Sequence, residues 1–405
     1  MSSTSAAKTD FYLMDELITD ADRAVRARVR EFGDSEVLPV IGGYWERAEF
    51  PFELVPSMAK LGVVGGTITG HGCPGLTAVQ AGLVAAELSR ADGGLGTFYG
   101  VQTFLAMQSI AFLGSEEQRE RWLPRMSQLE LIGAFGLTEP THGSDAVGLE
   151  TAARRDGDAF VLNGRKKWIG NASFADLVII WARGEDGNVG GYVVEKGTPG
   201  FDARVMTGKT ALRTAWQAEI TLDEVRVPAE NRLPGATRFS DVSKVLDRTR
   251  YTVAWRAMGM AQAAYELALA HALRREQFGQ PIAGYQLVQE KLVRMLAEVT
   301  SMQLLCLRLS QLADAGRMTA AMASLAKMNN AAKARAIMAD ARDIFGGDGI
   351  LVEHHLARYH ADIEAIYTFE GTDSIQKLIV GRDITGLSAI SGGAGRRPGA
   401  APRLA

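Results

Sequence analysis

The sequence predicts an α+β multi-domain protein with an N-terminal helical domain, a middle antiparallel β-barrel domain and a C-terminal four-helix bundle. At 405 residues the chain exceeds one ordinary hydrophobic core, so several domains are expected. Apolar residues recur at helical spacing towards both ends, whereas short strand-like segments with polar turns fill the middle. We therefore divide the chain into residues 1–131, 132–242 and 243–390, followed by a tail at 391–405.

The first domain is predicted to be helical. Val25, Val29 and Phe32 fall at i, i+4 and i+7, which places them on one helix face. Ser115 and Gln118 have the spacing of a capping box and are expected to open another helix. Between these signals, further helices are expected at 76–90 and 101–113.

The middle domain is predicted from short strands that alternate with tight turns. Segments 152–155 and 159–162 are expected to form a hairpin, because Asp156-Gly157-Asp158 between them favours a tight turn. This pattern is typical of an antiparallel barrel or sandwich of about a hundred residues. The remaining strands are expected at 177–182, 192–194, 219–222 and 225–227.

The last domain is predicted to be a bundle of long helices that begins near Ser243. Segments 254–275, 286–313 and 318–344 carry Leu, Met and Ala at spacings that suit a bundle core. The tail from Ser391 consists largely of Gly, Ala, Pro and Arg. It is expected to be disordered, because it has too little apolar bulk to fold.

Composition excludes several classes of protein. The 44 Lys and Arg residues nearly balance 47 acidic residues, so a nucleic-acid partner is not expected. The cysteines, Cys73 and Cys306, are far apart and argue against a disulfide framework or a zinc site. We expect no secretory signal at the N-terminus, no membrane insertion and no peroxisomal tripeptide at the C-terminus. A cytoplasmic protein is therefore expected.

Glu370 is the candidate catalytic residue. Ile366, Tyr367 and Phe369 precede it and would desolvate a charge, which raises the pKa of a carboxylate. Gly371 permits a sharp turn, and Thr372 or Asp373 can cap a following helix, whose N-terminus favours an anion. Such opposing influences suit a general base. The alternative is a solvated glutamate in a loop before a helix.

Other motifs suggest an anionic, aromatic ligand, but each has a structural alternative. Residues 136–145 form a loop whose backbone amides could face an anion, or an ordinary turn of the β domain. Trp168 could stack on a cofactor or fill the end of the barrel. Arg274 and Arg275 could bind phosphate, although arginine is also favoured at helix C-termini. The histidines of 353–360 match no common zinc pattern, so we expect no metal.

The order of these motifs from Asp20 to Ile390 resembles the acyl-CoA dehydrogenase superfamily. Residues 136–145 resemble the first signature of this family, and 343–362 resemble the second. Glu370-Gly371-Thr372 stands where the glutaryl-type branch carries its catalytic glutamate. Residues 44–52 and 250–255 look like glutaryl-CoA dehydrogenases and equally like plant short-chain acyl-CoA oxidases.

This resemblance implies FAD as cofactor and an acyl-CoA thioester as substrate. Glu370 would remove the α-proton while the β-hydrogen leaves as hydride to flavin N5, which yields a trans-2-enoyl-CoA. The Glu370 amide and a flavin ribityl hydroxyl would stabilise the enolate oxygen. The family also implies a homotetramer and, as electron acceptor, an electron-transferring flavoprotein.

The resemblance assigns roles to further residues. The candidates for binding FAD within one subunit are Phe135, Leu137, Thr138, Gly143, Ser144, Trp168, Ile169 and Gly170. The candidates at the end of the long helices, which would reach the FAD of a neighbouring subunit, are Arg275, Gln277, Phe278, Gln286, Asp343, Gly346 and Gly347. Thr372 and Ser374 would close over the adenosine. The candidates for binding the substrate are Thr97, Ser144, Arg250 and Gly371.

Departures from the family pattern bear on the substrate and the electron acceptor. Glutaryl-specific relatives hold the distal carboxylate with a Glu and an Arg, where this sequence has Ser89 and Gly96, so we expect a short uncharged chain of about butyryl size. A glutaryl-CoA dehydrogenase remains the alternative. Gly170 replaces the usual Thr or Ser beside flavin N5, which keeps a short-chain acyl-CoA oxidase open. The family's second location for the base, on the helix through 251–264, offers Arg256 and no carboxylate before Glu266.

Overall fold

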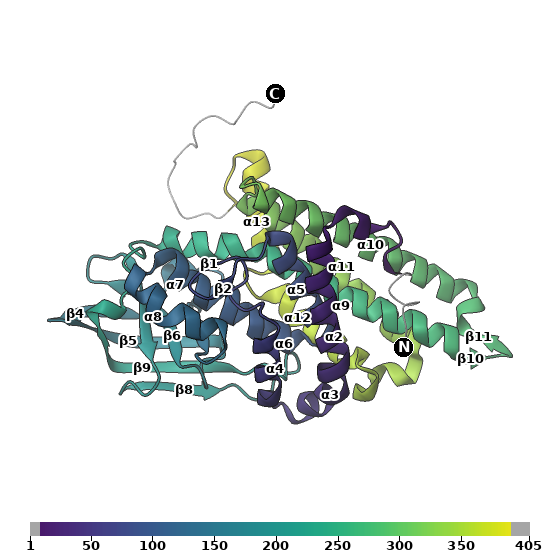
Figure 1. Ribbon diagram of the computed structural model, residues 1–405, viewed down its shortest axis with the longest axis horizontal. Helices are drawn as coiled ribbons and strands as arrows, with labels where there is room; N and C mark the ends of the chain where they lie inside the picture. The colour runs from purple at the N-terminus through teal and green to yellow at the C-terminus, as the bar shows by residue number, and fades with distance from the viewer. Residues whose placement is uncertain (1–8, 390–405) are drawn as a thin grey trace.

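The computed structural model describes residues 9–389 (Figure 1). The sheet lies at one end of the elongated molecule and the long C-terminal helices lie at the other, with the N-terminal helices packed along both (Figure 1). The predicted arrangement of helical, β and helical parts is confirmed. The tail predicted to be disordered, 391–405, lies outside the described residues. Within residues 9–389, no helix is both long enough and apolar enough to cross a bilayer.

The N-terminal part is helical, as predicted. Val25, Val29 and Phe32 are buried on one helix, and Ser115 and Gln118 form the predicted capping box. The predicted helix at 101–113 is longer than expected, because helical backbone runs on without a break from Gly93 to Leu113 through a π-helical turn. The helices are η1 (Met14–Leu17), α2 (Asp20–Phe32), η2 (Gly33–Val37), α3 (Leu38–Arg47), η3 (Phe52–Leu54), α4 (Val55–Lys60), α5 (Ala78–Ala91), α6 (Gly93–Gly100), η4 (Val101–Met107), α7 (Gln108–Leu113) and α8 (Glu116–Ser127); a short β1 (Thr69–Gly70) pairs with β2 (Cys73–Pro74).

The middle part is a seven-stranded sheet with the order β3-β6-β4-β5-β9-β8, and β7 pairs with β6. The predicted hairpin is present as β4 and β5, in which Ala153 lies opposite Leu162. The sheet is mixed, whereas antiparallel pairing was expected, because β6 runs parallel to both β3 and β4. The strands are β3 (Gly133–Gly136), β4 (Ala152–Asp156), β5 (Ala159–Gly170), β6 (Leu177–Gly184), β7 (Val189–Glu195), β8 (Phe201–Val205) and β9 (Gln217–Pro228), with short 3-10 turns at η5 (Ala146–Gly148) and η6 (Ala229–Asn231).

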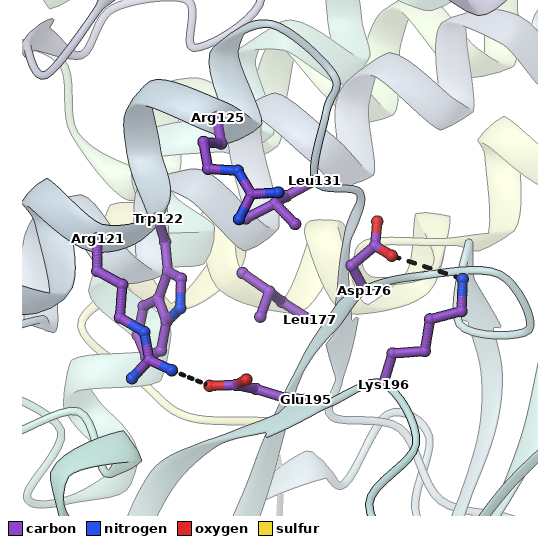
Figure 2. Close-up of a pocket in the computed structure, with 8 residues that line it drawn as sticks. All are labelled: Arg121, Trp122, Arg125, Leu131, Asp176, Leu177, Glu195 and Lys196. Atoms are coloured by element: carbon purple, nitrogen blue, oxygen red, sulfur yellow. Dashed lines mark hydrogen bonds and ion pairs between the residues drawn. The ribbon is translucent and has the colours of Figure 1, made fainter.

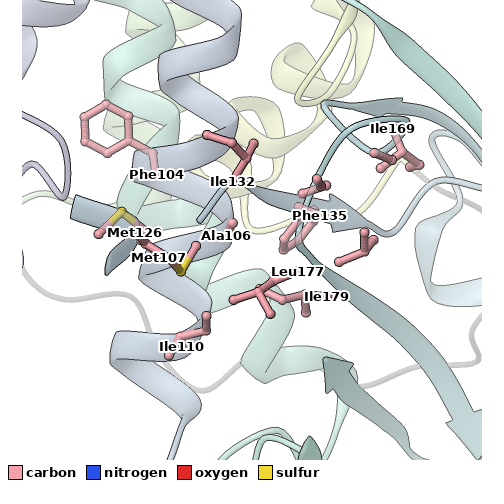
Figure 3. Packing of buried hydrophobic residues seen from close by; sticks show 14 of the residues in the cluster. Phe104, Ala106, Met107, Ile110, Met126, Ile132, Phe135, Ile169, Leu177 and Ile179 are labelled. Atoms are coloured by element: carbon pink, nitrogen blue, oxygen red, sulfur yellow. The ribbon is translucent and has the colours of Figure 1, made fainter. Parts of the chain in front are cut away.

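Helices of the N-terminal part cover one face of this sheet. Figure 3 shows Met107, Ile110 and Met126 of these helices packed with Phe135 and Leu177 of the strands. All of these side chains are buried, so the two parts share one hydrophobic core. The loops at the ends of β3 and β5 are therefore held at a fixed position against the helices.

The C-terminal part is a helical bundle around a second hydrophobic core. Its central helix, α9, packs closely on α5, and two glycines permit this approach. A Cβ on Gly259 would stand 2.1 Å from the Ala86 carbonyl oxygen, and a Cβ on Gly82 would stand 2.2 Å from Trp255 Nε1. The elements are α9 (Phe239–Arg274), β10 (Glu276–Gln277), β11 (Gln280–Pro281), η7 (Ile282–Gly284), α10 (Gln286–Asp314), α11 (Ala320–Phe345), η8 (Gly346–Ile350), η9 (Val352–His354), α12 (Leu356–Thr368) and α13 (Asp373–Thr385).

Candidate active site

Glu370 lies in the turn between α12 and α13, and side chains from two elements hold this turn. Glu370 has a φ of 51° and Gly371 a φ of 89°, so both lie in the left-handed region. The Gln376 side chain donates hydrogen bonds to the carbonyl oxygens of Glu370 at 2.8 Å and Gly371 at 3.0 Å. Lys327 Nζ donates to the carbonyl oxygens of Tyr367 at 3.0 Å and Gly371 at 2.8 Å. The unusual backbone conformation of the base candidate is therefore stabilised by the surrounding structure.

The Glu370 carboxylate is desolvated and lies near cationic groups. Its Oε2 atom is buried and has no hydrogen-bond partner. Burial raises the pKa of Glu370, while the charges of Arg256, Arg250 and Lys327 lower it. The opposing influence predicted for the helix N-terminus thus comes chiefly from side chains of α9 and α11. A carboxylate in such an environment can accept a proton without losing a hydrogen bond of its own.

Arg256 and Thr97 bring α9 and α6 together beside Glu370. Arg256 is 2% exposed, and its Nη2 donates a hydrogen bond to Thr97 Oγ1. Its guanidinium carbon lies 4.9 Å from the centre of the Phe369 ring, directly before Glu370 in the chain. Nη1 would lie 3.2 Å from a Cβ on Gly100. Thr97, a predicted substrate-binding residue, therefore belongs to the same site as Glu370.

The loop after β3 is anchored by a buried ion pair. Lys166 Nζ lies 2.8 Å from Glu139 Oε1 and donates to the Leu137 carbonyl oxygen at 3.1 Å. The pKa of Glu139 is lowered to about 2 by hydrogen bonds and by Lys166, against the effect of burial, and burial lowers the pKa of Lys166 to about 8, so both are charged at pH 7. Glu139 also accepts from the Glu150 and Thr151 amides, so it is committed to structure although His142 and Glu150 lie close enough for a metal site.

This anchoring brings together flavin-binding candidates from two strands. The Lys167 amide donates to the Thr138 carbonyl oxygen at 2.9 Å, which places Thr138 beside Trp168. Trp168 has a φ of 66° and is 55% exposed, so it does not fill the end of the sheet as the alternative interpretation proposed. At Gly170, a Cβ would stand 3.0 Å from Val101 Cγ2, so this strand end also faces the helix that carries Thr97. Phe135, Leu137 and Ile169 are buried here, whereas Gly143 and Ser144 are exposed.

A second group of predicted cofactor residues lies elsewhere. Arg256 and Arg275 are both on or next to α9 but are separated by about 28 Å along the helix axis. The residues of this second group lie around the C-terminal end of α9. Within one chain, none of them contacts Glu370. The members of the group, all exposed, are Arg275, Gln277, Phe278, Gln286, Asp343, Gly346 and Gly347.

The remaining candidates lie near the Glu370 turn. Arg250 is buried on α9, and its Nη1 lies 2.7 Å from Asp247 Oδ1. Thr372 caps α13, because its Oγ1 accepts from the Ile375 amide at 3.3 Å. Ser374, two residues further on, is exposed. Asp362, which follows the histidine segment, has a structural role, since its carboxylate accepts from the Leu212 amide at 2.6 Å and from Trp45 Nε1 at 3.1 Å.

A cavity of about 240 Å³ between α8 and the sheet contains none of these residues (Figure 2). Its charged groups are already paired, because Arg121 Nη2 lies 2.7 Å from Glu195 and Lys196 Nζ lies 3.5 Å from Asp176. It therefore provides no evidence for a reaction.

Sequence reasoning missed three groups around Glu370. Lys327 and Gln376 were not predicted, and Arg256 was considered only as the absence of a carboxylate. Lys327 is a lysine within an apolar stretch of α11 and is fully buried, so an isolated charge in an apolar helix was the available signal. Gln376 had no such signal, because its role depends on the backbone turn that it contacts.

Comparison with known proteins is consistent with this geometry. Models of the acyl-CoA dehydrogenase N-terminal, middle and C-terminal domains match residues 19–130, 134–225 and 239–385. A probable acyl-CoA dehydrogenase of Bacillus subtilis, YngJ, is 34% identical over 374 residues, covering 91% of this chain and 98% of the relative.

Two solved structures extend the comparison. A glutaryl-CoA dehydrogenase from Mycobacterium smegmatis, in complex with FADH2, has a TM-score of 0.93 and 39% identity, covering 95% of this chain and 99% of the other. Butyryl-CoA dehydrogenase from Megasphaera elsdenii has a TM-score of 0.87 and 28% identity, covering 91% and 98%. The chain described here therefore belongs to the acyl-CoA dehydrogenase family.

Proposed function

We propose that this protein catalyses the FAD-dependent α,β-dehydrogenation of a short-chain acyl-CoA to a trans-2-enoyl-CoA. The observation that carries the proposal is the Glu370 carboxylate, whose buried Oε2 has no hydrogen-bond partner. Burial raises the pKa of this carboxylate, and the positive charges of Arg256, Arg250 and Lys327 lower it. A buried acceptor without a partner is costly, so it is expected only where a ligand supplies one. A substrate α-C–H group beside Glu370 would supply the proton.

The residues at the ends of β3 and β5 fit a flavin. Trp168 presents an exposed aromatic face, and Thr138 lies next to it through the Lys167–Thr138 hydrogen bond. We propose that these residues, with Phe135, Leu137 and Gly170, hold the isoalloxazine ring. FAD, when bound, accepts the β-hydrogen with its electron pair.

The chain itself provides the proton transfer and the orientation. Glu370 receives the α-proton, so that its carboxylate becomes neutral during the reaction. The backbone at Glu370 is left-handed, and a hydrogen bond from Gln376 to the Glu370 carbonyl oxygen holds it in this conformation. We propose that the Glu370 amide, fixed in this way, stabilises the developing enolate oxygen. Lys327 contributes indirectly, since it fixes the carbonyl groups on both sides of Glu370.

We propose an electron-transferring flavoprotein, and not oxygen, as the electron acceptor. The oxidase alternative depends on free space beside Gly170. That space is restricted, because Val101 Cγ2 lies 3.0 Å from the position of a Cβ on Gly170. If the reduced enzyme with bound product is exposed to air, we expect reoxidation over many minutes. Reoxidation within seconds with stoichiometric hydrogen peroxide would establish the oxidase instead.

An uncharged chain end is supported by the packing of α5 against α6. A Cβ on Gly96 would stand 2.2 Å from Ser89 Oγ, so no side chain fits at this position to pair with a distal group. The glutaryl pair of the family is therefore absent from these helices. The similar solved structures include both a glutaryl-CoA and a butyryl-CoA dehydrogenase. Their names therefore do not decide whether the distal end of the acyl chain is charged.

We also propose a homotetramer in the cytoplasm. The cofactor candidates around Arg275 are exposed and remote from Glu370, which is the arrangement expected if they complete the site of a neighbouring subunit. Both cysteines are free thiols in the described structure, which fits a reducing compartment.

Anaerobic addition of butyryl-CoA to the FAD-loaded protein tests the proposal. Bleaching of the oxidised flavin absorbance, with crotonyl-CoA as product, is the expected result. If FAD binds but no short-chain acyl-CoA reduces it, the protein is a flavin- or CoA-binding protein without this activity.

A further inference from the structure

The strand end that carries Trp168 contains a β-bulge. In the pairing of β5 with β9, the register shifts between Lys166 and Ile169. Two residues of β5, Lys167 and Trp168, therefore lie opposite one residue of β9, Glu219. A bulge of this kind redirects the side chains at its position and is common next to active sites. Trp168 has a φ of 66°, which is rare for a bulky residue and persists only where its surroundings hold it.

Trp168 and Trp216, on neighbouring segments of the sheet, are held in different ways. Trp216 packs on Phe52 and Phe174, with ring centres 5.6 Å and 6.2 Å apart. Trp168 is 55% exposed and has no aromatic neighbour of this kind among residues 9–389. Its ring contacts the Lys167 ammonium instead, which lies 5.8 Å from the ring centre. The orientation of the Trp168 indole therefore depends on a cation, whereas aromatic packing fixes Trp216.

Lys167 is itself fixed by its backbone and by its side chain. Its amide donates a hydrogen bond to the Thr138 carbonyl oxygen at 2.9 Å, and its Nζ lies 2.8 Å from Glu219 Oε1. The hydrogen bond from Lys167 lowers the pKa of Glu219, so the pair is ionised at neutral pH. Because Glu219 is the residue opposite the bulge, this ion pair spans the bulge and holds the ammonium beside the Trp168 ring.

A cation over one face of an indole is attracted by the negative charge of the π system and leaves the other face for a flat ligand. We propose that Lys167, held by Glu219, is a positioning residue that fixes the Trp168 indole for contact with the isoalloxazine ring. This rests on the proposed FAD site and adds to it a pair of residues from two strands. Neither Lys167 nor Glu219 belongs to the predicted cofactor-binding residues, and neither needs to touch FAD.

Substitutions at Lys167 test this assignment. Lys167→Met removes the cation and keeps an unbranched side chain of similar length, whereas Lys167→Arg keeps both the cation and its pairing with Glu219. The control is Arg226→Met, which removes another exposed ion pair of β9, with Asp156. Time-resolved fluorescence anisotropy of the full-length apoprotein measures the mobility of the Trp168 indole, whose signal is obtained by subtracting that of the matching Trp168→Ala variant.

We expect the Trp168 indole to gain nanosecond mobility in Lys167→Met and to remain restrained in Lys167→Arg and Arg226→Met. Titration of the apoprotein with FAD should show an affinity that is about threefold to tenfold lower in Lys167→Met, because cation–π contacts and ion pairs at exposed sites are individually weak. Lys167→Arg should restore the affinity, and Arg226→Met should leave it unchanged. A merely structural role of Lys167 would lower the thermal stability without changing the indole mobility.

A double-mutant cycle separates positioning from direct contact with FAD. In the Trp168→Ala background, Lys167→Met should have no further effect on FAD affinity. An equal loss in both backgrounds would show that Lys167 acts on FAD directly and would overturn the proposal, as would an unchanged indole mobility in Lys167→Met. Failure of the proposed function has a different signature, since butyryl-CoA would then leave the bound flavin oxidised. The anisotropy and the FAD titration would still decide the role of Lys167.

Discussion

The Glu370 turn and the exposed end of the bundle both carry predicted site residues, but their surroundings differ. In the Glu370 turn, Lys327 and Gln376 bind the backbone carbonyl groups and three cations face the carboxylate. At the end of α9, Phe278 is 95% exposed, and the exposed Asp343 side chain pairs with Lys291. The difference indicates that the groups proposed for proton transfer are positioned within one chain. The side chains around Arg275 are exposed, as expected if they bind a cofactor or another subunit, as proposed above.

The sharpest test of the first region is Glu370→Gln. This nearly isosteric change should preserve the fold and FAD binding but lower flavin reduction by at least about a hundredfold, because an amide cannot accept the α-proton. Rapid mixing with substrate under anaerobic conditions measures this rate. Glu364→Gln is the control, since Glu364 is exposed on α12 and pairs with Arg335. Near-normal reduction in Glu370→Gln would remove Glu370 from its assigned role.

Lys327→Met tests whether the turn needs its buried lysine. The Tyr367 carbonyl oxygen would lose its hydrogen bond from Lys327, which should cost about 1–3 kcal/mol in the free energy of unfolding. A displaced base should lower kcat by up to about a hundredfold with a smaller change in KM. Lys333→Met, on the same helix, removes a partly exposed pair with Glu298 and a hydrogen bond to Ser301 Oγ, and it serves as the control. An unchanged kcat would show that the hydrogen bonds from Gln376 are sufficient to hold Glu370 in position.

Arg275→Gln tests the second region. We expect FAD affinity to fall about tenfold, as expected for loss of a hydrogen bond to a charged group. The rate of flavin reduction in the fully loaded enzyme should remain almost unchanged, because Arg275 lies far from Glu370. Titration of the apoprotein with FAD measures the affinity, and Arg294→Gln, which removes an exposed pair with Asp340, is the control. A large loss of rate at full loading would contradict the division into two regions.

The smallest expected effect concerns pH. Burial raises the pKa of Glu370, so kcat/KM should fall on the acidic side at a higher pH than an ordinary glutamate would produce, because the base must be ionised. Arg256 lowers that pKa. Arg256→Gln should therefore shift the acidic limb to higher pH when a neutral substrate is used. A limb that stays in place or moves to lower pH would mean that Arg256 does not act on Glu370.

Local patterns predicted much of this molecule. The stripe of Val25, Val29 and Phe32 and the capping box at Ser115 were correct, because both depend on residues within two helical turns. The parallel pairing of β6 with β3 was not predicted, because nothing in either segment specifies the direction of its partner. That direction depends on how the chain returns to the sheet.

The sequence by itself determined the order of the three parts and the placement of a glutamate between an apolar run and a helix cap, since these are properties of neighbouring residues. Only the tertiary structure decided what surrounds that glutamate. Arg256 and Lys327 approach Glu370 from α9 and α11, which are separated from it by 114 and 43 residues in the chain. The close packing of α9 on α5 at Gly82 and Gly259 fixes where the Arg256 charge lies. Such a contact depends on helix packing, which no local spacing specifies.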